Sequence, residues 1–466
     1  MTTQLLTVVV LTCLGYLLLT NVVAMVFILV GAVENAVRRH DSRSADYSTL
    51  ASSRFTIPVS VIVAAYNEEA VIENTVRSLL DFEYPEFEVI VANDGSSDGT
   101  LARMREAFAL EPYEIFVRRI LQSEEVRGIY RSAAHPNLVV LDKANGGKAD
   151  AWNAGLNVAR YRYVCGVDAD TVFDRNALLK VMRFAIQDPA RVIGVTSQIT
   201  TAKNPERMLA APPGRRPVDS EPLMVYQLLD FLRAFLNNRL AWSRLGFMLC
   251  SPGGFQIWRR DVLEEVGGYA RSFTCEDIEL TFRVHERFLR ERRDYHVHCL
   301  PDSIGVTEGP DSIAKLIAQR ERWQRVINET VVHYRRMWFN PRYRSVGLVG
   351  APFYLLTEVL SPAIELLGIG SLVAAAALGL FEPVAFVAIL GAMAFTNAAL
   401  TACAILFDDL QSRMYRRRDL ARMLMLAPFD LVLYRPFIFW ARLKGSWRFL
   451  RRDKGWYKFD RNVRAA

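Results

Sequence analysis

The stretch VSVIVAAYNEEAVIENTVRSLLDFEYPEFEVIVANDGSSDG, residues 59–99, decides the fold. Its two apolar runs, Val59–Ala65 and Phe87–Asn93, are typical of buried strands. The amphipathic segment between them, Glu69–Leu80, predicts a helix, and a second helix is predicted at Asp98–Leu110. Short strands therefore alternate with helices from residue 59 onward.

The same alternation continues through the middle of the chain. Further strands are predicted at Leu138–Leu141, Tyr163–Val167 and Val192–Ser197, and further helices at Ala149–Ala159 and Asn176–Ile186. This order predicts an α/β fold with a doubly wound, mostly parallel sheet, in which ligands bind at the carboxyl ends of the strands. The chain contains no G-x-G-x-x-G or Walker-type loop, which weakens the dinucleotide-binding and P-loop alternatives.

Polar residues follow three of the predicted strands. They stand in the sequence as Ala65-Tyr66-Asn67-Glu68, Asn93-Asp94-Gly95 and Asp168-Ala169-Asp170. Each alone is ordinary turn chemistry, and Asp98 further on fits a helix N-cap. Because three acidic strand ends would line one edge of a single sheet, together they predict a polar crevice for a nucleotide.

Asp168 and Asp170 form a D-x-D pair that could share a hard divalent cation, Mg²⁺ or Mn²⁺. Diphosphate oxygens would fill the other positions, and the metal would neutralise charge as the diphosphate departs. A lone D-x-D is common in surface turns. Lys148 strengthens the prediction, because it follows Asn145-Gly146-Gly147 at a predicted helix start, where anions bind.

Apolar residues make up 51% of the chain and are concentrated at its two ends. Met1–Val33 carries no charge and is long enough for a transmembrane helix. A signal peptide is the alternative, but no Lys or Arg precedes Arg38. Arg38, Arg39 and Arg43 follow the span, so the positive-inside rule places the next domain on the cytoplasmic side of the inner or plasma membrane.

The C-terminal part holds a second uncharged span, Pro383–Phe407. Val346–Phe381 before it is apolar except for Glu358 and Glu365, which would share one helix face. The two carboxylates face either a protein interior or, if this segment is partly interfacial, water. Met423–Trp440 predicts a kinked span or a re-entrant hairpin, and the basic tail after it favours the hairpin.

The predicted organisation has five parts. They are a transmembrane helix at 1–33, a linker at 34–56, a cytoplasmic domain at 57–345, a membrane region at 346–445 with interfacial and two or three transmembrane or re-entrant helices, and a basic tail at 446–466. Much of the net charge of +7 flanks the membrane segments, so anionic lipid head groups explain it without a nucleic-acid partner. His296 and His298 alternate along a predicted strand and are interpreted as structural.

Four motifs in chain order resemble the inverting, processive membrane glycosyltransferases of family 2. They are Asp94, Asp168-Ala169-Asp170, Glu276-Asp277 and Gln319-Arg320-Glu321-Arg322-Trp323. That family includes cellulose, chitin, hyaluronan and poly-N-acetylglucosamine synthases, and the resemblance covers roughly residues 57–337. It implies a GT-A-like fold, UDP-N-acetylglucosamine or UDP-glucose as donor, a saccharide acceptor, and accessory export subunits as further partners.

The resemblance also implies a role for each motif residue. The nucleotide would be bound by Asp94 with Ala65, Asn67 and Glu68, and the diphosphate by Lys148, Gln319 and Arg322. The diphosphate and the metal would both be bound by Asp168 and Asp170. The acceptor would contact Glu276, Gly253, Gly254 and Trp323, and Asp277 would be the general base. Two structural alternatives compete with these roles. Thr274–Asp277 also fits a helix capping box, and Trp323 could be a core residue of a covering helix.

Some features depart from the family pattern. Many relatives have Asp-Asp where this chain has Asn93-Asp94, and Leu249–Gly254 replaces the acceptor motif of cellulose synthases. The chain also ends without a cyclic-dinucleotide-binding domain, which counts against cellulose as the product. Two insertions, 111–136 and 204–222, are expected to be disordered loops or to shape the acceptor site. A glycolipid synthase resembling ceramide glucosyltransferase is the main alternative, and a non-catalytic nucleotide-binding membrane subunit is another.

Overall fold

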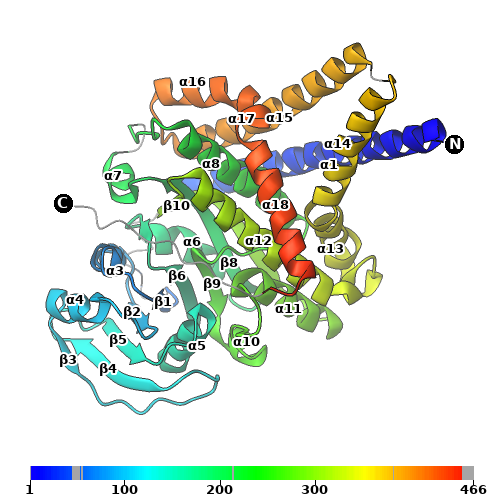
Figure 1. The fold of residues 1–466 in the computed structure, drawn as a ribbon. Coiled ribbons are helices and arrows are strands. Elements are labelled where there is room, and N and C mark those ends of the chain that lie inside the picture. Colours follow the sequence, from blue (N-terminus) through cyan, green and yellow to red (C-terminus); the bar gives the residue numbers. More distant parts are fainter. Residues whose placement is uncertain (1, 45–52, 54–55, 213–214, 381, 454–466) are drawn as a thin grey trace.

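The computed structural model describes residues 2–44, 53, 56–212, 215–380 and 382–453. In these residues ten strands form one sheet with the order β3-β4-β5-β2-β1-β6-β9-β8-β10-β7 (Figure 1). The strands are β1 (Val59–Ala65), β2 (Phe87–Asn93), β3 (Leu110–Pro112), β4 (Val126–Ser132), β5 (Leu138–Lys143), β6 (Tyr163–Asp168), β7 (Thr171–Phe173), β8 (Val192–Ala202), β9 (Phe255–Arg259) and β10 (His296–Glu308).

The four central strands β5, β2, β1 and β6 are parallel, as the sequence predicts. Their register pairs Ala65 with Asn93 and Ala64 with Asp168. The three polar strand ends therefore lie at one edge of the sheet, as the sequence predicts.

The sheet is antiparallel towards its margins. The insertion at 111–136, expected to be a disordered loop or to shape the acceptor site, supplies most of β3 and all of β4. Strand β4 runs antiparallel to both of its neighbours, β3 and β5. An uncovered sheet edge offers unpaired backbone N–H and C=O groups, and this hairpin satisfies them. The second insertion, 204–222, contains the short helix α7 (Pro205–Ala210), capped by the Asn204 side chain.

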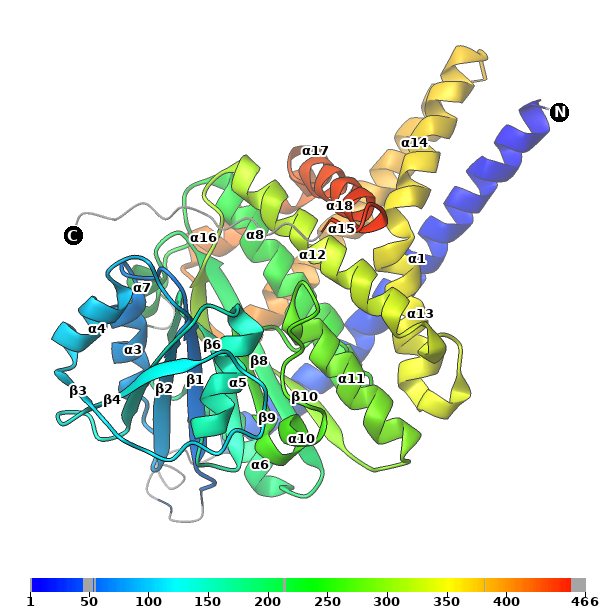
Figure 2. The ribbon, with the colours of Figure 1, turned by 60° about the horizontal axis from the view of Figure 1, so that its bottom comes forward.

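Helices cover both faces of the sheet (Figure 2). Alternate residues of β1 enter two cores, with Val61 and Val63 on one side and Ile62 on the other. The first core is closed by α3 (Ile72–Leu80), α4 (Thr100–Ala107) and α6 (Ala177–Gln187). The second is closed by α5 (Lys148–Val158), α8 (Pro222–Leu232), α9 (Leu240–Arg244), α10 (Arg260–Glu265), α11 (Glu276–Arg290) and α12 (Ile313–His333).

Three apolar helices extend away from the sheet (Figures 1 and 2): α1 (Thr2–Ser44), α14 (Ser361–Ala377) and α15 (Pro383–Ser412). Residues 4–38 and 386–410 are each long and apolar enough to cross a membrane. Helix α1 packs against α14 and α15 and continues through residues 34–44, part of the predicted linker. The rest of that linker lies largely outside the described residues, as do residues 454–466 of the basic tail.

The remaining helices form two bent pairs, each of which could be a broken span or a re-entrant loop. Residues 346–359, which include α13 (Ala351–Tyr354), meet α14 at 43°, and α16 (Arg417–Leu426) with α17 (Asp430–Leu433) meets α18 (Arg435–Leu450) at 47°. Helix α18 packs along α12. Its Arg442 lies 3.3 Å from Glu358 Oε2 and 3.6 Å from Glu365 Oε1, so the two glutamates share a protein partner.

Candidate active site

The end of β6 and the start of α5 bring opposite charges together. Lys148 is the first residue of α5, and Gly147 before it has a φ of +89°, which favours glycine. The Lys148 Nζ atom lies 2.6 Å from Asp168 Oδ1 and 3.1 Å from Glu276 Oε1. Three residues that the sequence separates widely thus form one cluster, which we call the open cluster.

Electrostatics fix the protonation of the open cluster. Burial lowers the pKa of Lys148, but the Asp168 and Glu276 carboxylates outweigh burial and hold that pKa well above its usual value. Burial raises the pKa of Glu276, and the Lys148 ammonium offsets only part of this shift. Lys148 is therefore a permanent cation at neutral pH, whereas Glu276 takes up a proton more readily than an ordinary glutamate.

Three donors hold Asp277 in place. The Gly253 amide donates to Oδ2 at 3.0 Å, and the Ile278 amide and the Cys275 thiol donate to Oδ1 at 2.8 and 3.1 Å. Burial is the main reason that the pKa of Cys275 lies well above its usual value, so the thiol keeps its proton. Helix α11 begins at Glu276 with Cys275 as its N-cap, and the capping box predicted from Thr274 does not form.

The two glycines predicted to bind the acceptor lie against the open cluster. A Cβ atom at Gly253 would come within 3.0 Å of Lys148 Nζ and 3.6 Å of Asp277 Oδ2. A Cβ atom at Gly254 would lie 3.9 Å from Asp168 Oδ2. Glycine at these positions keeps the space beside the carboxylates open.

The D-x-D pair could hold a divalent cation only together with further ligands. Asp170 accepts hydrogen bonds from the hydroxyls of Thr171 and Thr307, each at 3.3 Å. No group of three or more His, Cys, Asp or Glu side chains that could hold a metal occurs in the described residues. Asp168 and Asp170 thus fit a cation whose remaining ligands come from a bound diphosphate.

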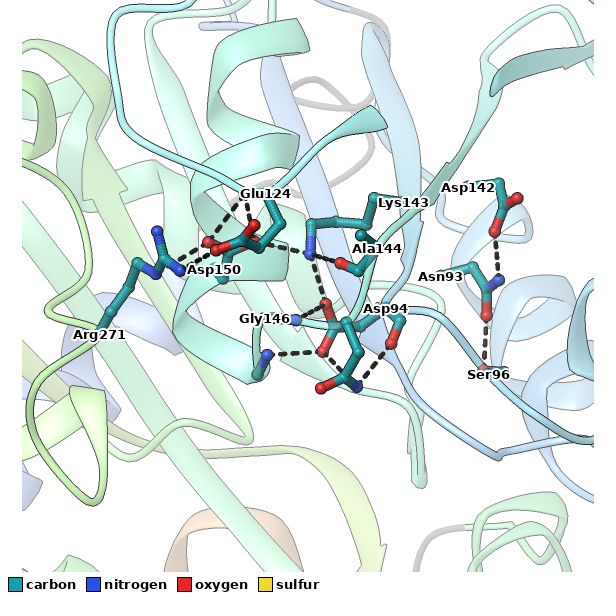
Figure 3. Close-up of polar contacts among 12 residues, drawn as sticks. Asn93, Asp94, Ser96, Glu124, Asp142, Lys143, Ala144, Gly146, Asp150 and Arg271 are labelled. Atoms are coloured by element: carbon teal, nitrogen blue, oxygen red, sulfur yellow. Dashed lines mark hydrogen bonds and ion pairs between the residues drawn. The ribbon is translucent and has the colours of Figure 1, made fainter. Parts of the chain in front are cut away.

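Asp94 is buried, with 2% of its surface exposed (Figure 3). The amides of Gly146 and Gly147 donate to Oδ1 and Oδ2 at 3.0 and 2.8 Å, and Lys143 Nζ lies 2.5 Å from Oδ1. Asn145 donates its side-chain amide to the same carboxylate at 3.2 Å. Asp94 therefore shapes the loop 145–147, and its predicted direct contact with a nucleotide stays a prediction.

The end of β1 contacts the same region. The Ala65 carbonyl accepts the Asp94 amide at 2.8 Å, and the Asn67 amide donates to Ser96 Oγ at 2.9 Å. The Glu68 amide donates to Thr100 Oγ1 at 2.8 Å. These contacts fix the two strand ends beside each other, where the sequence predicts the nucleotide to bind.

The predicted diphosphate and acceptor residues of α12 lie on one helix but in different surroundings. Gln319 Oε1 is buried and accepts no hydrogen bond within the part of the chain that the structure describes. Arg322 lies close enough to Cys275 for its charge to affect that thiol's pKa. The Trp323 ring is half-buried, 6.4 Å from the Phe231 ring and with Arg320 over its face at 4.4 Å.

Sequence reasoning missed residues whose role depends on tertiary contacts. Lys143 is fully buried between Asp94 and Asp150, and Arg271 reaches Asp150 from the segment before α11. Cys275 contacts the predicted base directly. The one available signal was the charge of Lys143 and Asp150 within otherwise buried elements, because unpaired charges are almost never buried.

Polar strand ends at one edge of an α/β sheet, with Lys148, Asp168 and Glu276 in contact there, are consistent with the class of GT-A-like nucleotide-sugar transferases. The model of glycosyl transferase family 2 matches residues 60–267, so the chain carries a glycosyltransferase domain of this family. It is similar to the poly-beta-1,6-N-acetyl-D-glucosamine synthase of Staphylococcus epidermidis, 25% identical over 62% of this chain and 59% of that protein. It is also similar to the probable glycosyltransferase YdaM of Bacillus subtilis, 26% identical over 62% of this chain and 59% of that protein.

The match thus spans about three-fifths of the length of these relatives. Among solved structures, the chain resembles the mannosyltransferase PcManGT from Pyrobaculum calidifontis, described in complex with GDP-Man and Mn²⁺. The TM-score is 0.53 at 17% identity, over 92% of this chain and 99% of the other. At this identity the likeness supports the GT-A-like fold alone.

Proposed function

We propose that this chain transfers a sugar from a UDP-sugar to a growing β-linked polysaccharide, with inversion at the anomeric carbon. The observation that carries the proposal is the meeting of Lys148, Asp168 and Glu276 beside Asp277 at the carboxyl ends of the strands. The relatives named poly-beta-1,6-N-acetyl-D-glucosamine synthase favour UDP-N-acetylglucosamine as donor and a saccharide as acceptor. UDP-glucose is the second donor to test.

In the proposed reaction, an acceptor hydroxyl attacks the anomeric carbon of the donor. A new carbon–oxygen bond forms while the bond from that carbon to the diphosphate oxygen breaks, and its electron pair leaves with UDP. Asp277 takes the hydroxyl proton, a contribution of about 10²–10⁴-fold for a positioned base. The Gly253, Cys275 and Ile278 donors keep its carboxylate oriented for this transfer.

The other charged groups act on the diphosphate. Lys148 would exchange its pairing with Asp168 for the phosphate oxygens, because both are anionic partners within its reach. Asp168 and Asp170 would hold Mg²⁺ or Mn²⁺, which supplies charge neutralisation for the leaving diphosphate. Gln319 and Arg322 are assigned to the same diphosphate.

A buried acceptor supports a hydroxyl-rich ligand. Gln319 Oε1 accepts no hydrogen bond within the described residues, whereas Glu276 Oε1 is paired with Lys148 Nζ at 3.1 Å. Buried oxygens normally have a donor, so Gln319 Oε1 fits a hydroxyl of a bound sugar. Trp323 would complete the acceptor site by stacking on a sugar face.

The membrane helices extend the proposal. Two helices that could each span a bilayer lie beside the domain, and the charge pattern after Val33 favours a cytoplasmic site. Synthesis would then occur on the cytoplasmic face of the cell membrane, with processive extension coupled to export. Accessory export subunits remain part of this proposal.

The test uses the full chain in lipid nanodiscs, incubated with a panel of UDP-sugars and Mg²⁺ or Mn²⁺. We expect UDP release, a polymeric product, and loss of both after EDTA treatment with recovery on adding the metal back. Turnover that survives EDTA would contradict the metal assignment. A short product in the lipid fraction would instead identify a glycolipid synthase, and absence of turnover with every donor would identify a non-catalytic subunit.

A further inference from the structure

Two buried carboxylates, Asp94 and Asp150, and two cations, Lys143 and Arg271, form a connected set of ion pairs (Figure 3). Lys143 Nζ is 2.5 Å from Asp94 Oδ1 and 2.6 Å from Asp150 Oδ1, and none of these three side chains is more than 3% exposed. Arg271 Nε is 3.0 Å from Asp150 Oδ2. The charges of these four side chains therefore balance. Three of the four lie between the end of β2 and the first turn of α5 in the sequence, and Arg271 supplies the fourth from a later segment.

Arg271 belongs to the segment that leads into α11 and Asp277. That segment is fixed at its start, where Tyr269 exchanges two backbone hydrogen bonds with the Asn153 side chain of α5, at 2.8 and 2.9 Å. It is fixed again near its end, where the Thr274 amide donates to Glu329 Oε2 at 3.1 Å. Arg271 lies between these two anchors and connects the middle of the segment to Asp150.

We propose that Arg271 is a positioning residue that couples the loop at 145–147 to the segment carrying Asp277, an inference that rests on the proposed function. The connection runs from Arg271 through Asp150 and Lys143 to Asp94. Asp94 in turn holds the amides of that loop. A UDP-sugar that orders the loop at 145–147 on binding would therefore also order the segment that positions Asp277.

The insertion at 111–136 completes this connection. Glu124 pairs with the Arg271 guanidinium, and its own amide donates to both Asp150 oxygens at 3.0 and 3.1 Å. The Arg271 and Glu124 side chains are 37% and 45% exposed, so they form the outer end of an otherwise buried chain of charges. The insertion thus contributes to the site through Glu124.

The test compares Arg271→Gln with Arg287→Gln in the full chain in nanodiscs. Arg287 is a matched control, because it is 42% exposed and, like Arg271, pairs with two carboxylates, here those of Glu265 and Glu291. Within the described residues it forms no ion pair with Asp94 or Asp150. In the nucleotide-free protein, we expect the amides of residues 145–147 to exchange hydrogen about tenfold faster in Arg271→Gln. The control should exchange at the rate of the unmodified protein.

The kinetic constants KM and kcat give a second test, because a residue with a purely structural role would not change both at an unchanged melting temperature. We expect Arg271→Gln to raise the KM for the donor and lower kcat, each about tenfold, with a melting temperature equal to that of the control. Arg271→Lys keeps a cation beside Asp150 and should recover most of both losses. A change in KM alone would overturn the coupling, because the loop would then be affected without the base.

The outcomes separate this inference from the proposed function. Unchanged hydrogen exchange at residues 145–147 in Arg271→Gln overturns the coupling, whatever the chain catalyses. A melting temperature well below that of Arg287→Gln, not recovered by Arg271→Lys, assigns Arg271 to fold stability and also overturns it. Failure of the unmodified protein to bind UDP overturns the proposed function, while the exchange experiment still decides the coupling.

Discussion

The first turn of α5 contributes to two clusters of charge that are built differently. Asp150 belongs to the buried network with Asp94 and Lys143, in which no side chain is more than 3% exposed. Lys148 belongs to the open cluster, where its side chain and that of Asp168 are 34% and 33% exposed. The network has fixed protein partners, whereas the open cluster can exchange its partners when a diphosphate enters.

This difference suggests that the buried network has a structural role and that the open cluster has a ligand-binding role. The network holds the loop at 145–147 in one conformation, and charges buried so completely must stay paired. The open cluster is only partly desolvated, so its ion pairs are weak enough to be replaced by ligand contacts. Variants in the two regions should therefore fail in different ways.

The largest expected effect is on chemistry beside the open cluster. Asp277→Asn should lower transfer by about 10²–10⁴-fold, because Asn cannot take the acceptor proton. UDP affinity should stay close to that of the unmodified protein. The melting temperature should fall only slightly, since Asn retains the side-chain shape and an oxygen for the Ile278 and Cys275 donors and loses only the bond from the Gly253 amide. Kinetics and calorimetry on one preparation measure all three.

Glu276→Gln is the matched control for this prediction. It removes a carboxylate from the adjacent position and leaves Asp277 in place. If Asp277→Asn were active and Glu276→Gln inactive, the base would be Glu276, whose raised pKa already favours proton uptake. Full activity of both variants would contradict a base at the start of α11.

The second effect is on stability and separates the two regions directly. Lys143→Met leaves Asp94 and Asp150 buried without their shared cation, and breaking a buried ion pair in this way costs about 3–5 kcal/mol. Lys148→Met should cost less, because Lys148 and Asp168 are about one-third exposed and the buried Glu276, whose pKa is already raised, can take up a proton. Thermal melting in nanodiscs measures both, and equal melting temperatures would refute the distinction between the two regions.

Much of the fold could be predicted from the sequence, because buried parallel strands are apolar runs with polar ends. Residues 59–65 and 87–93 were predicted with the bounds that β1 and β2 have. The antiparallel margin was not predicted, because β4 (VRGIYRS) has no continuous apolar run and its pairing depends on the neighbouring β5 edge. Local pattern thus determined the centre of the sheet, and tertiary pairing determined its margin.

The candidate site divides in the same way. Asp168, Lys148 and Glu276 could be predicted because their motifs carry the chemistry within a few residues. The partners of Asp94 could not, because Lys143 and Arg271 acquire their roles only when distant segments meet. The capping box at Thr274, the structural alternative for this motif, does not form, because the N-cap is Cys275, which has an extended backbone.

A third effect concerns α12, which lies outside both regions. Trp323→Ala should lower transfer by about a hundredfold while UDP still binds, because the acceptor sugar loses its stacking surface. The ring is partly exposed and contacts Phe231 and Arg320, so the melting temperature should fall modestly. A large drop in melting temperature together with weaker UDP binding would show that Trp323 is a core residue instead.

The smallest expected effect is a pH dependence of stability that arises from His285 in α11, the helix that carries Asp277. His285 of α11 is buried, with Nε2 donating to the Met248 carbonyl at 2.7 Å and Nδ1 accepting from the Tyr295 hydroxyl at 2.5 Å. Burial is the main cause that lowers the pKa of His285 from 6.5 to about 4. The folded protein therefore keeps the ring neutral at pH values where the unfolded chain protonates it.

This difference in protonation makes the protein less stable as the pH falls. Above pH 6.5 the contribution of His285 to stability is complete, and it is lost progressively as the pH falls towards 4. Between pH 6.5 and pH 5 the contribution of His285 to the free energy of unfolding should fall by about 1.6 kcal/mol. Burial lowers the pKa of His298 to about 3, so this ring should add a loss of its own over the same range. Melting temperatures measure the total loss: His285→Gln should reduce the slope of the curve, and the double variant with His298→Gln should reduce it further. An unchanged slope in His285→Gln would show that His285 does not contribute.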